Sequence, residues 1–399
     1  MSEGGARCGF SLIPAATGLP LQQKAKGERS GTMDVEGNAL APNVLSIKQY
    51  LAEYSAERRR AGKSKLAYRF PVREGMGLPA LGAPASAAAP ALQLGFGFGP
   101  FLDEACRAAL FEGEAESDSG SAAPQGVVSC AEPVRASRPS AAFEHAGLVG
   151  GYPLTIYSVS PFVLMANVER LDGIAAPRGW EDLLDPRFAG RVAVTAEPSE
   201  HNVAVLGTHA LFGDDGVRAL ARNVMAGVSA SVMALQVSDQ PVLPGQDATP
   251  GAPATDPAPA TPGAPTAPAP APATLAPATL APAVYVVPWF FARICEGRPN
   301  VQVIWPEEGA LAFPLWMVLQ KDATEAARDL AAHFAGEQFA RESACLCLPT
   351  MNAASDEELP DEAKKLFWMG WDYFRTLDVP RFRRLIEREM PMIEGMHAR

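Results

Sequence analysis

Several aromatic and polar side chains lie where a strand pattern gives way to a helix pattern, and these residue types could bind a small polar molecule. In open α/β sheets, ligands bind beyond the carboxyl ends of strands, close to helix N-termini whose N–H groups favour anions. Aromatic rings at the same places could stack on a ligand. The candidate ligand-binding residues at these junctions are Phe96, Gly97, Glu197, Ser199, His201, Asn202, Ser229, Tyr285 and Trp289.

Each candidate also has a purely structural interpretation. Phe96 and Phe98 alternate along the segment GFGFGP (95–100), so at least one of them is expected in the core. Ser199 is a good helix N-cap, and a histidine such as His201 at a helix start is often only solvent-exposed. Trp289 is equally suited to packing. The sequence leaves both interpretations open for these residues.

The sequence shows no pattern of a catalytic, cofactor or metal site. The segment GFGFGP has Pro100 where a dinucleotide-binding GxGxxG motif needs glycine, and neither GxxxxGK[ST] nor GxSxG is present. The five histidines are scattered, and the six cysteines form neither CxxC nor a zinc-ligand spacing. We therefore predict a binding protein without cofactor or metal, not an enzyme.

Charge and composition narrow the classes of partner. The net charge of −11 argues against a nucleic-acid partner, which needs a basic face. A length of 399 residues predicts two or three domains, and a hydrophobic fraction of 48% is ordinary for a globular protein. No run of 18 apolar residues is present, so no membrane span is expected.

The stretch Tyr152–Thr195 organises the predicted elements. A β-favouring run, Leu154–Ala166, precedes a helical piece at 180–184 and a second strand at 192–195. A helix from Ser46 to Ala61, a helix from Pro100 to Phe111 and helices after Ser199 complete the pattern on either side. Strands alternating with helices predict an α/β fold.

Two segments resemble those of the solute-binding proteins of ABC importers. Residues 177–194 match the form PxxWEDLLDPxFxGRVAV, which opens the second lobe in that family, and 305–336 (WPEEGALAFPLWMVLQKDATEAARDLAAHFAG) resemble its return strand and following helix. The resemblance implies a two-lobed periplasmic-binding-protein-like fold, with a mixed sheet flanked by helices in each lobe and two crossover strands between the lobes. Tyr157 and Ser158, on the first crossover strand, would lie between the lobes and join the candidate site.

The resemblance also implies domain boundaries. Lobe one would comprise residues 43–160 and 310–399, and lobe two residues 161–309. Residues 1–42 have no hydrophobic period and many glycines, which predicts a disordered segment. Residues 244–282 are almost entirely Pro, Ala, Thr and Gly and predict a low-complexity insertion within lobe two.

By this resemblance, the chain would act as a monomer that captures a small polar solute by hinge closure and delivers it to a membrane permease. The solute could be anionic, a chelated metal or a polyamine. Iron(III)-binding relatives use a paired Tyr-Tyr element near the position of Ala283-Val284-Tyr285, but this chain has only Tyr285 there. Direct coordination of iron(III) by such a tyrosine pair is therefore not expected.

The N-terminus does not fit the location that the resemblance implies, which is the periplasm or the cell surface. The apolar piece Cys8–Leu21 is interrupted by Pro14, Gly18 and Pro20, so it does not form the uninterrupted core of a signal peptide. This leaves a cytoplasmic location open. The alternatives are a cytoplasmic enzyme or ligand sensor on the same two-lobe fold, and an interaction scaffold that uses residues 244–282.

Overall fold

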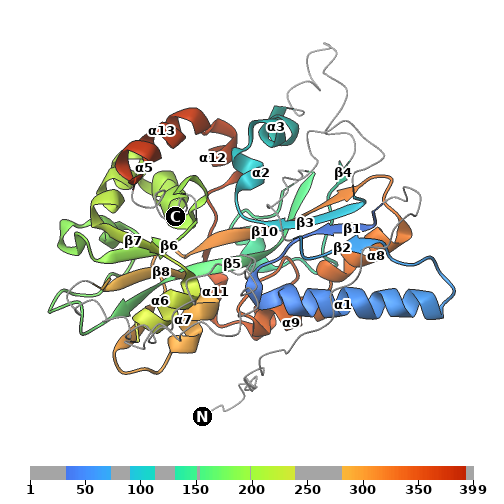
Figure 1. Cartoon of the computed structure of the whole chain (residues 1–399), viewed down its shortest axis with the longest axis horizontal. Helices are drawn as coiled ribbons and strands as arrows, with labels where there is room; N and C mark the ends of the chain where they lie inside the picture. The colour runs from blue at the N-terminus through green and yellow to red at the C-terminus, as the bar shows by residue number, and fades with distance from the viewer. Residues whose placement is uncertain are drawn as a thin grey trace, which may run out of the picture.

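A mixed β-sheet of eleven described strands runs through the molecule and carries helices on both faces (Figure 1). The computed structural model describes residues 33–72, 90–112, 131–150, 153–197, 199–238 and 281–391. The strands are β1 (Val35–Gly37), β2 (Tyr68–Arg69), β3 (Leu92–Phe96), β4 (Ala131–Glu132), β5 (Leu154–Asn167), β6 (Val192–Thr195), β7 (Val224–Val228), β8 (Val284–Pro288), β9 (Val301–Ile304), β10 (Ala310–Gln320) and β11 (Leu366–Phe367). Their order is β2-β1-β3-β10-β5-β8-β6-β7, while β4 and β11 pair with β10, and β9 pairs with β5.

Two long antiparallel strands, β5 and β10, connect the two lobes. Their register runs from Leu311↔Phe162 to Val318↔Leu154, and β10 also pairs with β3 of lobe one. From Phe162 onward, β5 pairs instead with β8 and β9 of lobe two. All fourteen residues of β5 are buried, as expected for a strand covered on both faces. The two crossover strands that the sequence predicted are therefore confirmed.

Helices form a layer on each face of the sheet. In Figure 1, α2, α3, α5, α12 and α13 lie on the upper face, and α1, α6, α7, α9 and α11 on the lower face. The helices are α1 (Ala41–Arg60), α2 (Gly99–Leu102), α3 (Glu104–Arg107), α4 (Ala141–His145), α5 (Val203–Asn223), α6 (Ala230–Gln236), α7 (Trp289–Cys295), α8 (Glu325–Phe334), α9 (Glu337–Cys345), α10 (Ala354–Glu358), α11 (Asp361–Lys364), α12 (Trp371–Thr376) and α13 (Val379–Glu389).

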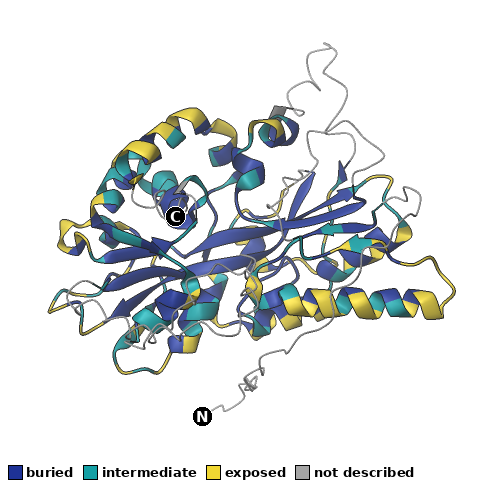
Figure 2. Ribbon diagram, viewed as in Figure 1, coloured by how far each residue is buried: buried dark blue, intermediate teal, exposed yellow. Residues whose placement is uncertain are grey.

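Alternation along the strands divides the core of lobe two between the faces. Val284 and Val286 of β8 belong to one apolar cluster, while Tyr285 and Val287 belong to another that includes Trp289 of α7. Successive strand residues point to opposite faces, so a continuous apolar run such as VYVV supplies both layers. Figure 2 shows the buried sheet between the partly exposed helices.

The two segments that carry the family resemblance contact each other. Trp180 is 2% exposed, and its indole Nε1 donates a 2.8 Å hydrogen bond to the Gly309 carbonyl at the start of β10. The Glu308 carboxylate accepts from the backbone N–H groups of Trp180 and Glu181, where it satisfies the start of the 3-10 turn Glu181–Leu184. The WEDLLDP and PEEG segments are thus hydrogen-bonded to each other at the start of the crossover strand β10.

The structure differs from the sequence prediction at several element boundaries. α1 begins at Ala41 with Pro42 in its first turn, so Ser46 lies inside the helix and does not cap it. The segment 1–42 was predicted to be disordered, but Val35–Gly37 forms β1, because a short strand is stabilised by its long-range partners β2 and β3. The domain boundaries otherwise stay predictions.

The predicted helix from Pro100 to Phe111 is broken into α2, α3 and a π-helical segment, Ala108–Glu112. Asp103 interrupts it and caps α3, since its carboxylate accepts from the Cys106 N–H at 2.9 Å. α5 is interrupted at Gly213, whose φ is 65°. The low-complexity segment 244–282 lies outside the described residues except for its last two.

Two further observations concern the described residues alone. No helix among them is long and apolar enough to cross a membrane. Within the same ranges, no three His, Cys, Asp or Glu side chains gather closely enough to hold a metal ion.

Candidate ligand-binding site

The strand register brings the carboxyl ends of strands from the two lobes toward each other. In lobe one, β1 and β3 are parallel, and Phe96 at the end of β3 pairs with Leu315 of β10. In lobe two, β6 is parallel to both β7 and β8, and Pro288 at the end of β8 pairs with Phe162, which lies opposite Leu311. Leu311 and Leu315 are about 13 Å apart along a strand. The facing strand ends therefore border one region above β5 and β10, which we call the cleft region.

The junction between β3 and α2 is fixed by hydrogen bonds to β10. Gly97 has a φ of 80°, its N–H donates to the Pro314 carbonyl at 2.8 Å, and its own carbonyl accepts from Trp316 Nε1 at 3.2 Å. Both backbone groups of Gly97, a candidate ligand-binding residue, are thus already used within the protein. Its role in the structure is to hold the loop against the crossover strand.

Aromatic rings gather around Phe313 at the base of this region. Phe313 lies 6.2 Å from Phe96, 5.4 Å from Phe98 and 5.7 Å from Phe162, measured between ring centroids. Phe98 is fully buried, whereas Phe96 keeps intermediate exposure, as the alternation along 95–100 indicated. Of the two, only Phe96 has ring surface to offer a ligand.

The junction between β6 and α5 is built around a buried asparagine. Asn202 is 0% exposed, and its Oδ1 accepts from the Ala204 N–H at 3.0 Å while its Nδ2 donates to the Thr195 carbonyl at 2.7 Å. Asn202 therefore caps α5, a role that the sequence had suggested for Ser199. Ser199 lies in the preceding 3-10 turn, Ser199–His201.

Glu197 is the most perturbed acid at this junction. Burial raises the pKa of its carboxyl to about 7, opposed by the hydrogen bond that Thr195 Oγ1 donates at 3.1 Å and by the nearby His201. His201 is partly exposed, and its Nε2 lies 3.4 Å from Glu200 Oε1. A carboxyl with this pKa is present in both protonation states near neutral pH, so it can donate or accept a hydrogen bond.

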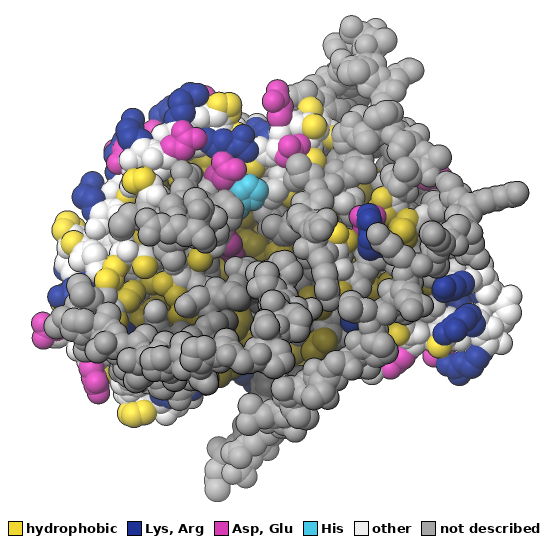
Figure 3. All heavy atoms as spheres, in the orientation of Figure 1, with side chains coloured by type: hydrophobic (Ala, Val, Ile, Leu, Met, Phe, Trp, Pro, Cys, Tyr) yellow, Lys and Arg dark blue, Asp and Glu magenta, His cyan; other side chains and the backbone are white. Residues whose placement is uncertain are grey.

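Arg383 of α13 connects the two sides of the cleft region. Its Nε donates to Glu200 Oε2 at 2.7 Å, and its guanidinium also reaches the Leu102 carbonyl of α2 at 3.5 Å. The hydrogen bond with His201, together with the charge of Arg383, lowers the pKa of Glu200. Figure 3 shows charged side chains over α5 and α13 and apolar side chains toward the centre of the same face. No local motif in the sequence marks Arg383, because its partners are distant in the chain.

The other candidate residues of lobe two, at the ends of β7 and β8, differ in whether they are buried in the core. Ser229 stands at the N-cap position of α6 without capping it, and its Oγ lies 3.4 Å from Ser231 Oγ. Tyr285 is fully buried within β8, where its hydroxyl accepts from Arg170 Nη1 at 2.9 Å. Trp289 begins α7 at 3% exposure. Ser229 thus borders the cleft region, whereas Tyr285 serves the core.

Tyr157 and Ser158 are both fully buried on β5 beneath the helices of lobe one. The Tyr157 ring packs 5.7 Å from Phe334 and 5.9 Å from Phe339. Ser158 donates to the Pro349 carbonyl at 2.8 Å. They lie on the crossover strand as predicted, but the structure turns them into the core of lobe one. A strand buried on both faces gives no local signal of which side faces a cleft.

A pocket of about 570 Å³ lies on the lower face, between the lobes. One wall is α7 and Trp305, and the other is the segment that joins α10 to α11. The lining residues are Trp289, Arg293, Glu296, Trp305, Glu358, Leu359, Pro360 and Glu362. Only Trp289 among them was a sequence candidate, since the others are assembled from separate parts of the chain.

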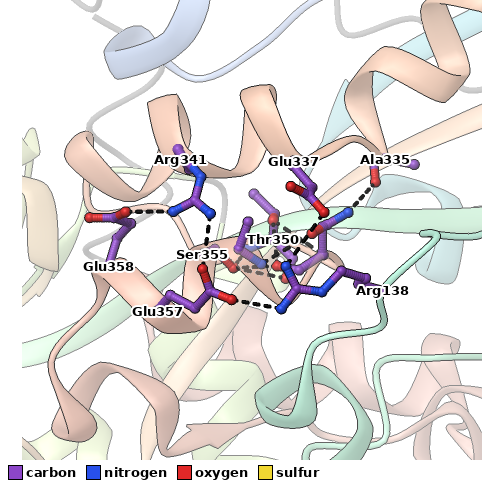
Figure 4. A network of polar contacts seen from close by, with 10 residues as sticks. Arg138, Ala335, Glu337, Arg341, Thr350, Ser355, Glu357 and Glu358 are labelled. Atoms are coloured by element: carbon purple, nitrogen blue, oxygen red, sulfur yellow. Dashed lines mark hydrogen bonds and ion pairs between the residues drawn. The ribbon is translucent and has the colours of Figure 1, made fainter.

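Ion pairs hold α10 in its place at this pocket. Arg341 of α9 binds Glu358 at 2.7 Å and Glu357 at 2.9 Å, and Arg138 binds Glu357 at 2.6 Å from the other side (Figure 4). These two arginines lower the pKa of Glu357. Below them, Ser355 Oγ accepts from the Thr350 N–H at 3.1 Å. The network fixes one wall of the pocket relative to α9.

Comparison with known proteins agrees with this geometry. Residues 138–250 and 267–377 match the family of bacterial extracellular solute-binding proteins, more than half of the chain. The chain belongs to this family. Comparison with curated proteins gave no match.

Solved structures share the fold at low sequence identity. The Bordetella ferric binding protein is 12% identical with a TM-score of 0.52, over 89% of this chain and 98% of that one. The apo ferric ion-binding protein A of Pasteurella haemolytica is 10% identical with a TM-score of 0.54, over 89% and 96%. The spermidine/putrescine ABC transporter substrate-binding protein PotD of Streptococcus pneumoniae is 12% identical with a TM-score of 0.50, over 91% and 100%. The fold of this solute-binding protein is thus that of two-lobed periplasmic binding proteins.

Proposed function

We propose that this solute-binding protein captures a small polar solute between its lobes and delivers it to the membrane permease of an ABC importer. The observation that carries the proposal is the register that turns the ends of β1 and β3 toward those of β6, β7 and β8 across β5 and β10. Helix N-termini and loops at such strand ends are the usual ligand sites of α/β sheets. Family membership supports the same function.

The two crossover strands supply a route for closure. A solute that contacts both lobes binds the closed form more tightly than the open form and therefore shifts the population toward it. Arg383 already contacts Glu200 and the Leu102 carbonyl from one helix, so polar groups of both sides meet at this place. The permease would then recognise the closed form.

The groups at the cleft region favour a solute with hydrogen-bonding groups. His201, Ser229 and the Glu197 carboxyl are polar, and Phe96 adds a partly exposed ring. Neighbours of the same fold are named for ferric ion and for spermidine and putrescine. An anionic metabolite, a chelated metal and a polyamine are the classes to be tested.

The family description also supports a location outside the cytoplasm, in the periplasm or on the cell surface. Fractionation of the native host, followed by detection of the full chain, tests this. Recovery only in the cytoplasmic fraction would contradict export.

Native mass spectrometry of the purified full-length protein tests the proposed function. We expect a retained small molecule that is released on denaturation. Ser229→Arg should abolish retention because the new side chain extends from the end of β7 into the cleft region. Leu45→Arg, at a residue of α1 that is 62% exposed, is the control and should retain the molecule. Equal loss in both variants, or retention in both, would contradict a solute held at this strand end.

A further inference from the structure

The C-terminal end of α1 carries a basic surface in a chain that is acidic as a whole. Residues 41–65 contain six Lys and Arg and two Glu, a net charge of +4, whereas the whole chain has a net charge of −11. Figure 3 shows Lys and Arg side chains at the right edge of the molecule, where Figure 1 places the C-terminal end of α1. We call this surface, formed by Arg59, Arg60, Lys63 and Lys65, the basic tip. A local charge can attract a partner that the net charge repels.

The backbone after α1 holds the basic tip in one shape. Gly62 has a φ of 69°, and its N–H donates to the Arg59 carbonyl at 3.1 Å. The Lys63 N–H donates to the Arg58 carbonyl at 2.9 Å, which completes the Schellman arrangement of a helix end. The Arg58 guanidinium is 7% exposed and donates to the carbonyl and the hydroxyl of Ser64, each at 3.2 Å. Arg58 therefore stabilises the turn that presents the exposed cations together.

Most of the charge on the basic tip is not neutralised within the protein. Lys63 binds Glu325 at 2.7 Å. Arg59, Arg60 and Lys65 are exposed, and among the residues that the structure describes no carboxylate lies within ion-pairing distance of them. Basic side chains in a last turn stabilise a helix through its dipole. That effect accounts for two arginines, but Lys65 lies beyond the end of the helix.

We propose that the basic tip docks on the anionic phospholipid surface of the membrane that holds the permease. A planar anionic surface fits a basic patch at one end of the molecule, because the acidic remainder of the chain stays in solvent. The choice of a membrane rests on the proposed delivery of solute to a permease. Docking raises the effective concentration of the solute-binding protein beside the permease.

Cosedimentation of the full-length protein with vesicles tests the proposal. The anionic vesicles contain phosphatidylglycerol and phosphatidylcholine, and the neutral vesicles contain phosphatidylcholine alone. Each Lys or Arg near an anionic surface raises the partition coefficient about fivefold, so we expect binding to the anionic vesicles to be at least about tenfold stronger. Binding should also weaken at least about tenfold in about 0.5 M NaCl. Equal binding to both kinds of vesicle, or no binding to either at low salt, would overturn the proposal.

Variants of the basic tip locate the docking surface. Arg59→Gln, Arg60→Gln and Lys65→Gln together should weaken binding to anionic vesicles at least about tenfold. Arg59→Lys combined with Arg60→Lys should keep it, because the charge is retained. Unaltered binding in the triple glutamine variant would contradict the assignment.

A matched control removes the same charge from another surface. Arg222 of α5 and Arg384 and Arg388 of α13 are exposed. Arg222→Gln, Arg384→Gln and Arg388→Gln together should leave vesicle binding unchanged. An equal loss in both triple variants would mean that net charge alone governs the binding, and would overturn the role of the basic tip.

Two further results separate this proposal from its alternatives. Ser229→Arg, which should abolish retention of the solute, should bind anionic vesicles as the wild type does, so failure of docking and failure of solute capture are distinct outcomes. Retention on immobilised heparin without binding to vesicles would assign the basic tip to an anionic polymer and overturn docking on a membrane.

Discussion

On the upper face of the sheet, ion pairs and hydrogen bonds border an apolar contact between α5 and α13, whereas the lower face joins the lobes through a separate apolar cluster. Above, Arg383 binds Glu200, Arg381 binds Asp214 at 2.6 Å, and Tyr373 hydrogen-bonds His209 at 2.8 Å. Below, one apolar cluster joins α7 to the segment around α9 and α11. Its members from the two lobes include Val287, Trp289, Ala292, Cys295, Ala344, Cys347, Leu359 and Ala363.

The difference bears on how the molecule can open. Exposed ion pairs are weak and are screened by salt, so they can separate and re-form at little cost. Opening an apolar core exposes surface to water at roughly 25 cal/mol per Å². We therefore expect the ion pairs of the upper face to separate at less cost than the apolar contacts of the lower cluster. Four measurements test this comparison.

The largest effect is expected from Leu359→Ala in the lower core. Leu359 is 5% exposed, and its truncation should destabilise the protein by about 2–4 kcal/mol, since the lost contacts leave a cavity. The effect should not depend on salt. Urea denaturation at low and high ionic strength measures it, with Leu45→Ala, at a residue 62% exposed, as the control. A loss below 1 kcal/mol would mean that the lower core does not hold the lobes together.

Glu197→Gln should change the pH dependence of stability. The folded pKa of about 7 lies above the ordinary value of 4.5, so the stabilising contribution is complete below pH 4.5 and is lost as the pH rises through about 7. The upper bound is about 3 kcal/mol, and we expect about 1–2 because the side chain keeps contact with solvent. Thermal denaturation between pH 4 and 8 should show a smaller decline in the variant. Parallel curves for both proteins would contradict a Glu197 carboxyl whose pKa is raised by burial.

Arg383→Gln should have a smaller effect that depends on salt. Its ion pair with Glu200 is partly exposed, so we expect a loss of about 0.5–1 kcal/mol at low ionic strength and less at 0.5 M NaCl. Arg388→Gln on the same helix serves as the control, because Arg388 is 63% exposed and pairs with its neighbour Glu389. If the effect of Arg383→Gln were as large as that of Leu359→Ala at every salt concentration, the contrast between the faces would be wrong.

The smallest effect should come from the Arg381–Asp214 pair. Arg381 lowers the pKa of Asp214, but its side chain is 66% exposed. A double-mutant cycle with Arg381→Gln and Asp214→Asn should give a coupling energy of about 0.3–0.5 kcal/mol. A coupling above 2 kcal/mol would show that the upper contact is as rigid as the lower one.

The sequence was sufficient for the features that depend on local pattern. The apolar run 154–166 predicted β5, and the segments around Trp180 and Glu308 predicted a family whose fold the structure confirms. Side-chain direction was not predictable: Tyr157 and Tyr285 lie on the strands expected, but strands buried on both faces give no alternation that marks a cleft.

Contacts between residues that are distant in the chain could not be predicted from the sequence either. Arg383 meets Glu200 across 183 residues of sequence, and Glu362 lines the same pocket as Trp305 because β9 and β11 flank the crossover strands. In contrast, the Asn202 cap could have been predicted from the sequence, since asparagine followed by VAVL is a normal helix start. Ser199, three residues earlier, was an equally good local candidate.

Arg170, just after β5, holds the carbonyl of Gln236 at 2.8 Å and that of Pro282 at 3.2 Å, while Asn167 Nδ2 donates to the Val237 carbonyl at 2.8 Å. One guanidinium thus holds together two points that lie 46 residues apart in the sequence. Exchange of the intervening residues for a brief glycine-serine connector should leave the scaffold intact, because closure entropy varies slowly with loop length. The same position offers a permissive attachment point where a fluorescent reporter could be grafted without disturbing either lobe.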